Sequence, residues 1–161
     1  MKRLFSFLLL ASLLCLSFLA QAQPRKLPPF RVLQANGKVF NASQLPMGKP
    51  IVVVYFSPDC DHCQVLMRDF FKRAEDFKKA SVALITFQPA AMLQKFVDDY
   101  HVSRYPNIIA GTEGTSFFVR NYYNIQQMPF VALHDPNGNL LASWQREVPL
   151  KELVKRLQQL K

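Results

Sequence analysis

Two cysteines separated by two residues, Cys60 and Cys63, are the side chains of this 161-residue chain best suited to chemistry. The chain has three cysteines, and the third, Cys15, lies in an apolar N-terminal run. A disulfide between residues three apart closes a loop too small to constrain the unfolded chain much. We therefore expect the pair to act through its reactivity, as two thiols that form and break a disulfide.

The surroundings of the pair favour a reactive thiol. Residues 51–56 are a continuous β-branched and aromatic run, which is typical of a strand buried on both faces. From about Cys60 to Lys79, apolar residues recur at spacings of three and four, which predicts an amphipathic helix. Free N–H groups and the positive end of the helix dipole would stabilise a thiolate at Cys60. Cys63, one turn further in, could attack a mixed disulfide formed by Cys60.

The two residues between the cysteines are candidates for tuning them. A protonated His62 would favour the Cys60 thiolate, whereas the negative charge of Asp61 would oppose it. Both residues are equally consistent with exposed positions in a first helical turn, where an acid is favourable in any case. The sequence supports the two interpretations equally.

Other uses of a Cys-x-x-Cys pair fit this sequence less well. A zinc site needs a second pair of ligands, and neither His101 nor His134 has a partner at ligand spacing. Covalent haem attachment needs a histidine directly after the second cysteine, where this chain has Gln64. A purely structural bridge would stabilise little. The sequence therefore predicts neither a metal nor an organic cofactor.

The N-terminal residues predict export. A basic start at residues 1–3 precedes an apolar run over residues 4–19, and a small-x-small cleavage site ends at Ala22. The run is shorter than the about 20 residues that span a membrane. We expect residues 1–22 to be a signal peptide and residues 23–161 to be a single mature domain without a stable membrane span. The expected location is the periplasm or an equivalent exported compartment.

The charge of the mature chain is positive but scattered. Without Lys2 and Arg3, the 20 basic residues fall to 18 against 11 acidic ones, a net charge of +7. The densest basic group, within residues 72–79, also contains Glu75 and Asp76, as is typical of a solvated helix face. We therefore expect no nucleic-acid partner.

The remaining elements alternate between strands and helices. An Asn36-Gly37 turn predicts an N-terminal hairpin, and further apolar patterns predict strands at 81–87, 106–110, 130–133 and 140–144 and helices at 89–100, 114–123 and 149–157. Such alternation favours a helix-covered sheet whose core strands are parallel and whose edge is antiparallel.

Two segments carry a resemblance to a known family. They are residues 52–63, which end in Cys60-Asp61-His62-Cys63, and residues 123–138, which contain Met128-Pro129. Through them the chain from about Pro28 onward resembles the exported thioredoxin-like family of the TlpA/ResA type. The resemblance implies an α/β thioredoxin-like fold, with a central mixed sheet flanked by helices, an N-terminal β-hairpin and a central insertion over residues 89–123. It also implies a cis Met128–Pro129 bond facing the cysteines. Met128 itself is expected either to line a substrate groove beside Cys60 or simply to pack in the fold, and the sequence supports both equally.

The activity implied by the resemblance is that of a thiol-disulfide oxidoreductase. Cys60 would be the nucleophile, Cys63 would resolve the mixed disulfide, and the two would form the redox disulfide. The implied partners are exported protein thiols or disulfides and an upstream electron donor, with the reductase direction favoured.

The chain departs from the family at the proton acceptors for the second thiol. Thioredoxins carry a buried acid where this chain has Val54, and ResA-type members carry a glutamate where it has Leu66. Asp61, another carboxylate or water must then take that role. The residue after the cis-proline is usually threonine, and Phe130 in its place predicts a more apolar groove.

Other functions remain as alternatives. A copper chaperone of the Sco type would use both thiolates and a distant histidine such as His134, although those proteins place three residues between the cysteines. His134 itself, near a turn, is expected to be a surface or capping residue. A redox-inert binding module is also consistent with the sequence. A peroxiredoxin-like peroxidase would need a threonine in the loop before Cys60, and none is present.

Overall fold

The computed structural model describes residues 26–46 and 48–160. The predicted signal peptide, residues 1–22, lies outside the described residues. Within the described ranges, no helix is both long enough and apolar enough to cross a membrane.

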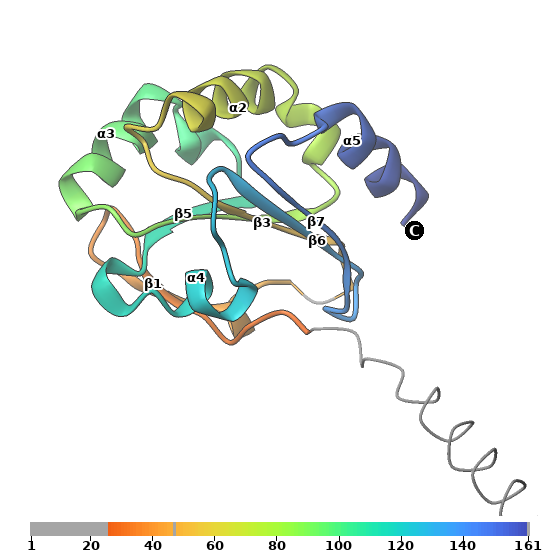
Figure 1. The fold of residues 1–161 in the computed structure, drawn as a ribbon, viewed down its shortest axis with the longest axis horizontal. Coiled ribbons are helices and arrows are strands. Elements are labelled where there is room, and N and C mark those ends of the chain that lie inside the picture. Colours follow the sequence, from red (N-terminus) through yellow and green to blue (C-terminus); the bar gives the residue numbers. More distant parts are fainter. Residues whose placement is uncertain (1–25, 47, 161) are drawn as a thin grey trace, which may run out of the picture.

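A seven-stranded mixed sheet forms the centre of the molecule (Figure 1). Its strand order is β2-β1-β5-β4-β3-β6-β7. The central strands β3, β4 and β5 are parallel, and the pairs on either side of them are antiparallel, which confirms the predicted arrangement. The strands are β1 (Arg31–Leu33), β2 (Val39–Asn41), β3 (Ile51–Tyr55), β4 (Ser81–Thr86), β5 (Ile108–Thr112), β6 (Phe130–His134) and β7 (Leu140–Gln145).

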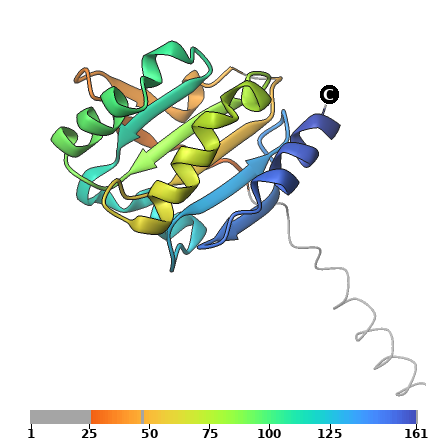
Figure 2. The ribbon, with the colours of Figure 1, turned by 90° about the horizontal axis from the view of Figure 1, so that it is seen from above.

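Helices cover both faces of this sheet. Three of them, α2, α3 and α5, lie on one face, and the short α4 lies on the other (Figure 1). Seen from above, α2 runs between α3 and α5 (Figure 2). The α-helices are α2 (Asp61–Lys72), α3 (Ala90–Asp99), α4 (Phe118–Tyr123) and α5 (Leu150–Gln159), and single 3₁₀ turns are η1 (Ala42–Gln44), η2 (Ala74–Phe77), η3 (Val102–Arg104) and η4 (Gly114–Ser116).

Strand β3 divides the core into two clusters. All of its residues are buried, and successive side chains of a strand point to opposite faces. Val52 and Val54 face the cluster that contains Cys63 and the apolar sides of α2, α3 and α5. Val53 and Tyr55 face the cluster that contains the buried side chains of α4. The strand is therefore anchored on both sides directly before the cysteine loop.

The helix predicted from Cys60 to Lys79 is shorter than expected. It ends at Lys72, and η2 follows after Arg73. The tighter turn places Phe77 fully in the core. Asn107 supports this geometry because its side-chain amide donates to the carbonyls of Phe77 and Ala80, both at 3.0 Å.

Candidate redox site

The cysteines lie where β3 passes into α2, as the sequence predicts. Cys60 is the N-cap of α2 and has extended backbone angles. Its N–H donates to the Ser57 carbonyl at 3.2 Å, and its carbonyl accepts the Gln64 N–H at 2.9 Å. Cys60 is half-buried and Cys63 is buried, and both carry free thiols in this structure. The two sulfurs thus differ in access, with Cys60 at the surface and Cys63 beneath it.

The environment of Cys63 holds its thiol in the neutral form. Burial raises the pKa of Cys63 to about 12, the Ser57 N–H opposes this rise, and the neighbouring Cys60 and Asp59 add to it. The Ser57 N–H donates to Cys63 Sγ at 3.5 Å. A contact of this kind favours the thiolate form. Cys63 therefore needs a proton acceptor before it can act as a nucleophile.

A polar cluster of Ser57, Asp59 and Gln88 lies beside the pair. The Ser57 hydroxyl donates to Asp59 Oδ1. The Gln88 side-chain amide donates to Ser57 Oγ at 2.9 Å and to Asp59 Oδ1 at 3.2 Å. Gln88 is itself held by Thr112, whose hydroxyl donates to the Gln88 carbonyl at 2.7 Å. Asp59 is adjacent to Cys60 in sequence and could have been weighed there, whereas Gln88 enters only through the folding of β4 beside β3.

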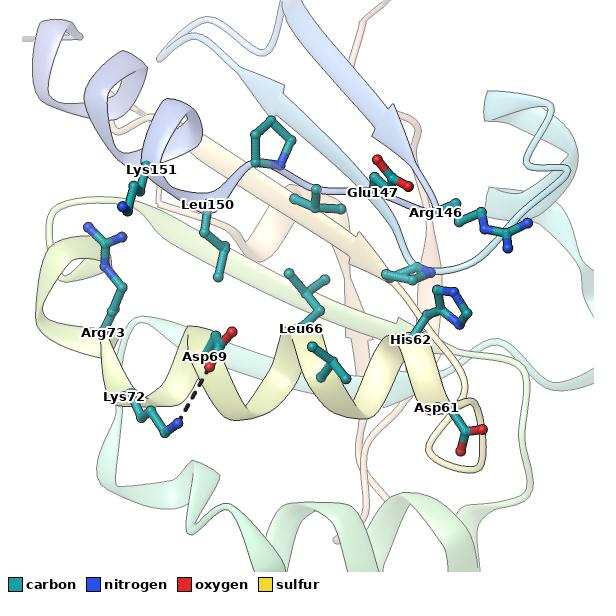
Figure 3. Close-up of a pocket in the computed structure, with 14 residues that line it drawn as sticks. Asp61, His62, Leu66, Asp69, Lys72, Arg73, Arg146, Glu147, Leu150 and Lys151 are labelled. Carbon is teal, nitrogen blue, oxygen red and sulfur yellow. Dashed lines mark ion pairs between the residues drawn. The ribbon is translucent and has the colours of Figure 1, made fainter.

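Asp61 and His62 are exposed residues of the first turn of α2. Both line a groove of about 830 Å³ between α2 and the segment that joins β7 to α5. Figure 3 shows Leu66 and Leu150 extending into this groove from its two sides, with His62 and Arg146 at one end and Lys151 at the other. One end of an apolar groove therefore lies at His62, which is between the two cysteines in sequence.

The Met128–Pro129 bond is cis, as the resemblance implies. Pro129 is buried and lines the same groove as His62. Met128 is half-buried and packs against both core clusters, so it lies between the two faces of the sheet at this end. Gln145 fixes the approach to the proline, because its side-chain oxygen accepts the Gln126 and Gln127 N–H groups at 2.8 and 3.0 Å.

Phe130 does not make the groove more apolar, so that prediction is wrong. Its side chain is buried in the cluster on the α4 face. There it packs on the ring of Tyr123, with the ring centroids 4.9 Å apart. Alternation along β6 explains this, because the residue after Pro129 must point away from the face that carries α2.

The prediction that His134 is a surface or capping residue is also wrong. His134 is 0% exposed, and its Nε2 lies 3.0 Å from the Tyr123 hydroxyl. It pairs with Ile51 at the start of β3, whereas Phe130 pairs with Tyr55 at the end that leads to the cysteines. Four strand residues separate these ends by roughly 13 Å, so His134 cannot join Cys60 and Cys63 in one copper site.

The family positions of the usual proton acceptors are apolar here. Val54 and Leu66 are both buried in the cluster that contains Cys63. The described residues do contain a buried carboxylate, Glu113, which sequence reasoning missed. It accepts the Tyr55 hydroxyl and the Val119 N–H, both at 2.7 Å. Since Tyr55 points to the α4 face, Glu113 serves the packing of α4 and not the thiol of Cys63.

No metal site is evident in residues 26–46 and 48–160, since no three His, Cys, Asp or Glu side chains gather there in a way that could hold an ion. What the described residues bring together is a half-buried thiol, a buried thiol, a polar cluster and an apolar groove. This arrangement is suited to thiol-disulfide exchange, in which one thiol is reachable and the other is held behind it.

The fold is thioredoxin-like. It is similar to the dsbF protein of Mycobacterium tuberculosis, with a TM-score of 0.69 and 22% identity over 84% of this chain and 99% of that one. It is similar to a secreted Mycobacterium tuberculosis disulfide oxidoreductase homologous to Escherichia coli DsbE, with a TM-score of 0.68 and 19% identity over 82% and 96%. It is also similar to the exposed lipoprotein thioredoxin Etrx1 of Streptococcus pneumoniae, with a TM-score of 0.61 and 18% identity over 81% and 98%.

Sequence comparison identifies the family. The AhpC/TSA family matches residues 24–157, which is most of the chain, and the protein belongs to that family. No curated protein matches the chain.

Proposed function

We propose that this protein is a thiol-disulfide oxidoreductase that exchanges disulfides with exported proteins through Cys60 and Cys63. The observation that carries the proposal is the graded access of the two thiols at a helix start: Cys60 is half-buried, and Cys63 is buried behind it. The neighbouring Cys60 contributes to the raised pKa of Cys63, as expected of two thiols that lie close together one helical turn apart. The similarity to structures described as disulfide oxidoreductases supports the same function.

The reaction proceeds in two exchanges. The Cys60 thiolate attacks one sulfur of a substrate disulfide, which forms a mixed disulfide and releases the other substrate sulfur as a thiolate. The Cys63 thiolate then attacks Cys60 Sγ, which forms the Cys60–Cys63 disulfide and releases the second substrate thiol. Two electrons pass from the pair to the substrate, and an upstream dithiol donor restores the pair. The reverse direction uses the same bonds.

The groove beside His62 and Pro129 provides the surface on which an extended substrate segment lies. Its apolar walls come from Val65 and Leu66 on one side and from Val148 and Leu150 on the other. A segment seated there passes the first turn of α2, because the groove is lined by Pro129 and by His62, which lies between the two cysteines in sequence. The resemblance to the TlpA/ResA type favours the reductase direction.

Export is part of the proposal. The basic start and apolar run of residues 1–19, followed by the small-x-small site at Ala22, support a signal peptide. Two similar structures are described as a secreted protein and an exposed lipoprotein. An exported location would place the pair where protein disulfides persist.

The equilibrium of the pair with glutathione tests both the activity and its direction. A reduction potential near or below about −270 mV supports the reductase direction, and one near about −120 mV would reverse it. Reduction of insulin by the dithiothreitol-charged protein gives the activity itself, with Cys60→Ser as the inactive control. A pair that forms no Cys60–Cys63 disulfide under any glutathione ratio would contradict the proposal.

A further inference from the structure

The second exchange requires that Cys63 lose a proton, and the usual acceptors are missing. Val54 and Leu66 occupy their positions. Cys63 is fully buried, and its pKa is raised to about 12, chiefly by burial. At neutral pH a thiol with such a pKa is almost entirely protonated, so an internal acceptor would accelerate the step.

Ser57 connects Cys63 to a carboxylate. Its N–H donates to Cys63 Sγ at 3.5 Å, and its hydroxyl donates to Asp59 Oδ1. Gln88 holds both partners in place through its side-chain amide, which donates to Ser57 Oγ at 2.9 Å and to the two Asp59 oxygens at 3.2 and 3.4 Å. The three side chains form one hydrogen-bonded unit that reaches solvent at Asp59, and the backbone N–H of Ser57 links this unit to the buried sulfur.

A small cavity adjoins the same sulfur. It has a volume of about 20 Å³ and is lined by Cys63, Ser57 and Gln64, among others. A site of this volume with polar partners has room for one water. Ser57 lines this cavity and also bonds to Asp59, so it lies on the path between the thiol and the carboxylate.

We propose that Asp59, held by Ser57 and Gln88, accepts the proton of Cys63 in the resolving step. The Cys63 S–H bond breaks, and its proton passes to a water in the adjoining cavity. That water gives a proton to the Ser57 hydroxyl, whose own proton moves to the Asp59 carboxylate. The thiolate attacks Cys60 Sγ, the Cys60–Cys63 bond forms, and the bond between Cys60 and the substrate sulfur breaks. The departing substrate thiolate takes the proton back from Asp59, so charge and protons balance. This inference rests on the proposed function and assigns its proton acceptor.

The titratable groups that face Cys63 are few. From the loop before α2 they are Asp59 and Cys60. From α3, Tyr100 lines the same cavity, and burial raises the pKa of its phenol, so it stays protonated and cannot accept the proton. His62 lies on α2 but is exposed on the groove side. The other residues that line the cavity are uncharged: Phe56, Ser57, Pro58, Gln64, Met67 and Phe96.

The aromatic disulfide DTNB separates the two steps in a single experiment. In the full chain carrying Cys15→Ser, attack by Cys60 releases one equivalent of thionitrobenzoate, and attack by Cys63 on the resulting adduct releases a second. Asp59→Asn keeps an oxygen for the Ser57 hydroxyl and removes the base. We expect it to slow the second release at pH 7 by about tenfold or more, within the range of general base catalysis, and to leave the first release within about twofold.

An electrostatic role and a proton-accepting role of Asp59 predict opposite changes in the rate of the second release, so this experiment distinguishes them. The negative charge of Asp59 raises the pKa of Cys63, so a purely electrostatic role predicts a faster second release in Asp59→Asn. Asp98→Asn removes an exposed carboxylate of α3 that belongs neither to the polar cluster nor to the groove, and it is the control, expected to change the second release less than about twofold. An unchanged or faster second release in Asp59→Asn, or equal slowing in both variants, would overturn the proposal.

The pH profile and two further variants complete the test. The difference in second-release rate between Asp59→Asn and the parent should become smaller as pH rises toward the pKa of Cys63, because solvent hydroxide then removes the proton. Asp59→Glu should restore part of the rate, and Gln88→Ala should slow the second release while leaving the first unchanged. Slowing that is equal at every pH would contradict a proton-accepting role. If the parent itself shows no second release, the proposed function fails. If the parent shows both releases and Asp59→Asn matches its rates, only the role of Asp59 fails.

Discussion

Cys63 and His134 are both fully buried at opposite ends of the β3–β6 pair, yet only one of them is placed for chemistry. In each case burial shifts the pKa toward the neutral form, upward to about 12 for Cys63 and downward to about 4 for His134. Cys63 lies behind a half-buried thiol, a polar cluster and the end of a groove. His134 contacts the Tyr123 hydroxyl and is closed in by core.

The difference shows that a perturbed pKa indicates burial alone. Whether a buried group can take part in chemistry depends on its access to solvent and substrate. The described neighbours of His134 provide no route to solvent chemistry, and its Nδ1 has no hydrogen-bond partner among the described residues. Cys63 instead lies behind Cys60, the more accessible of the two described thiols. The perturbed histidine at one end of the strand pair is thus enclosed by core, whereas the perturbed cysteine at the other end lies where the proposed exchange requires it.

Replacing the cysteines one at a time is the strongest test of this comparison. Cys60→Ser should abolish capture of substrate disulfides, because Cys63 is buried and cannot reach them. Cys63→Ser should leave capture intact and remove resolution, so that mixed disulfides with exported partners accumulate. Non-reducing electrophoresis of both variants, with the trapped partners identified by mass, gives the result. Capture by Cys60→Ser and not by Cys63→Ser would reverse the two roles.

Alkylation rates measure how much Cys60 and Cys63 differ in thiol reactivity. In the reduced, folded protein at pH 8, iodoacetamide should modify Cys60 at least about 100-fold faster than Cys63, since the thiolate is the reactive form and Cys63 is both buried and protonated. Mass spectrometry of the modified peptides gives both rates. In urea the two rates should converge. Equal rates in the folded protein would remove the graded access on which the proposed function rests.

The pH dependence of stability tests the other end of the strand pair. The pKa of His134 is lowered in the folded protein to about 4, against about 6.5 in an unfolded chain. Between these values the unfolded chain binds a proton that the folded protein does not, so stability is fully present above pH 6.5 and is lost as pH falls toward 4. The loss from this one group is on the order of 3 kcal/mol.

Urea unfolding of the parent and of His134→Gln between pH 4 and 7 measures that loss. Glutamine cannot take up the proton, so the variant should lack this part of the pH dependence while being less stable at pH 7. Disulfide exchange should be unchanged in the variant wherever it remains folded. An identical pH dependence in the two proteins would contradict the assignment to His134.

A groove variant should give the smallest effect. Val65 is 51% exposed and lines the groove. Val65→Asp should lower kcat/KM for a protein substrate by roughly 5- to 30-fold, which corresponds to about 1 to 2 kcal/mol of lost apolar contact. Leu141→Asp is the matched control, since Leu141 is 44% exposed on β7 and does not line the groove. Equal effects of the two variants would show that the groove does not bind substrate.

Much of the fold was predictable because local patterns agree with the tertiary structure. Three segments predict their structure from their own residues alone. They are the buried run of β3, the amphipathic start of α2 and the Asn36-Gly37 turn. The position of the cysteines between β3 and α2 followed from these elements. The cis bond at Pro129 came from family resemblance, since no local pattern indicates it.

The errors came from features that depend on contacts between distant segments. The 3₁₀ turn that follows α2 is held by Asn107, which binds the carbonyls of Phe77 and Ala80. The burial of His134 depends on its register with Ile51 and on Tyr123. The polar cluster depends on Gln88, which lies 31 residues from Ser57. None of these pairings can be derived from periodicity along a single segment.

The hydrogen bond from Thr112 to Gln88 has an evolutionary consequence. Thr112 ends β5, and its hydroxyl binds the backbone carbonyl of Gln88, whose side chain holds Asp59 beside the cysteines. A substitution at position 112 therefore acts on the polar cluster through the backbone at position 88. Among descendants of this chain, we expect positions 88 and 59, whose side chains bond to each other, to change together and position 112 to keep a hydroxyl. Exposed positions such as Lys95 and Asn121 should vary independently of all three.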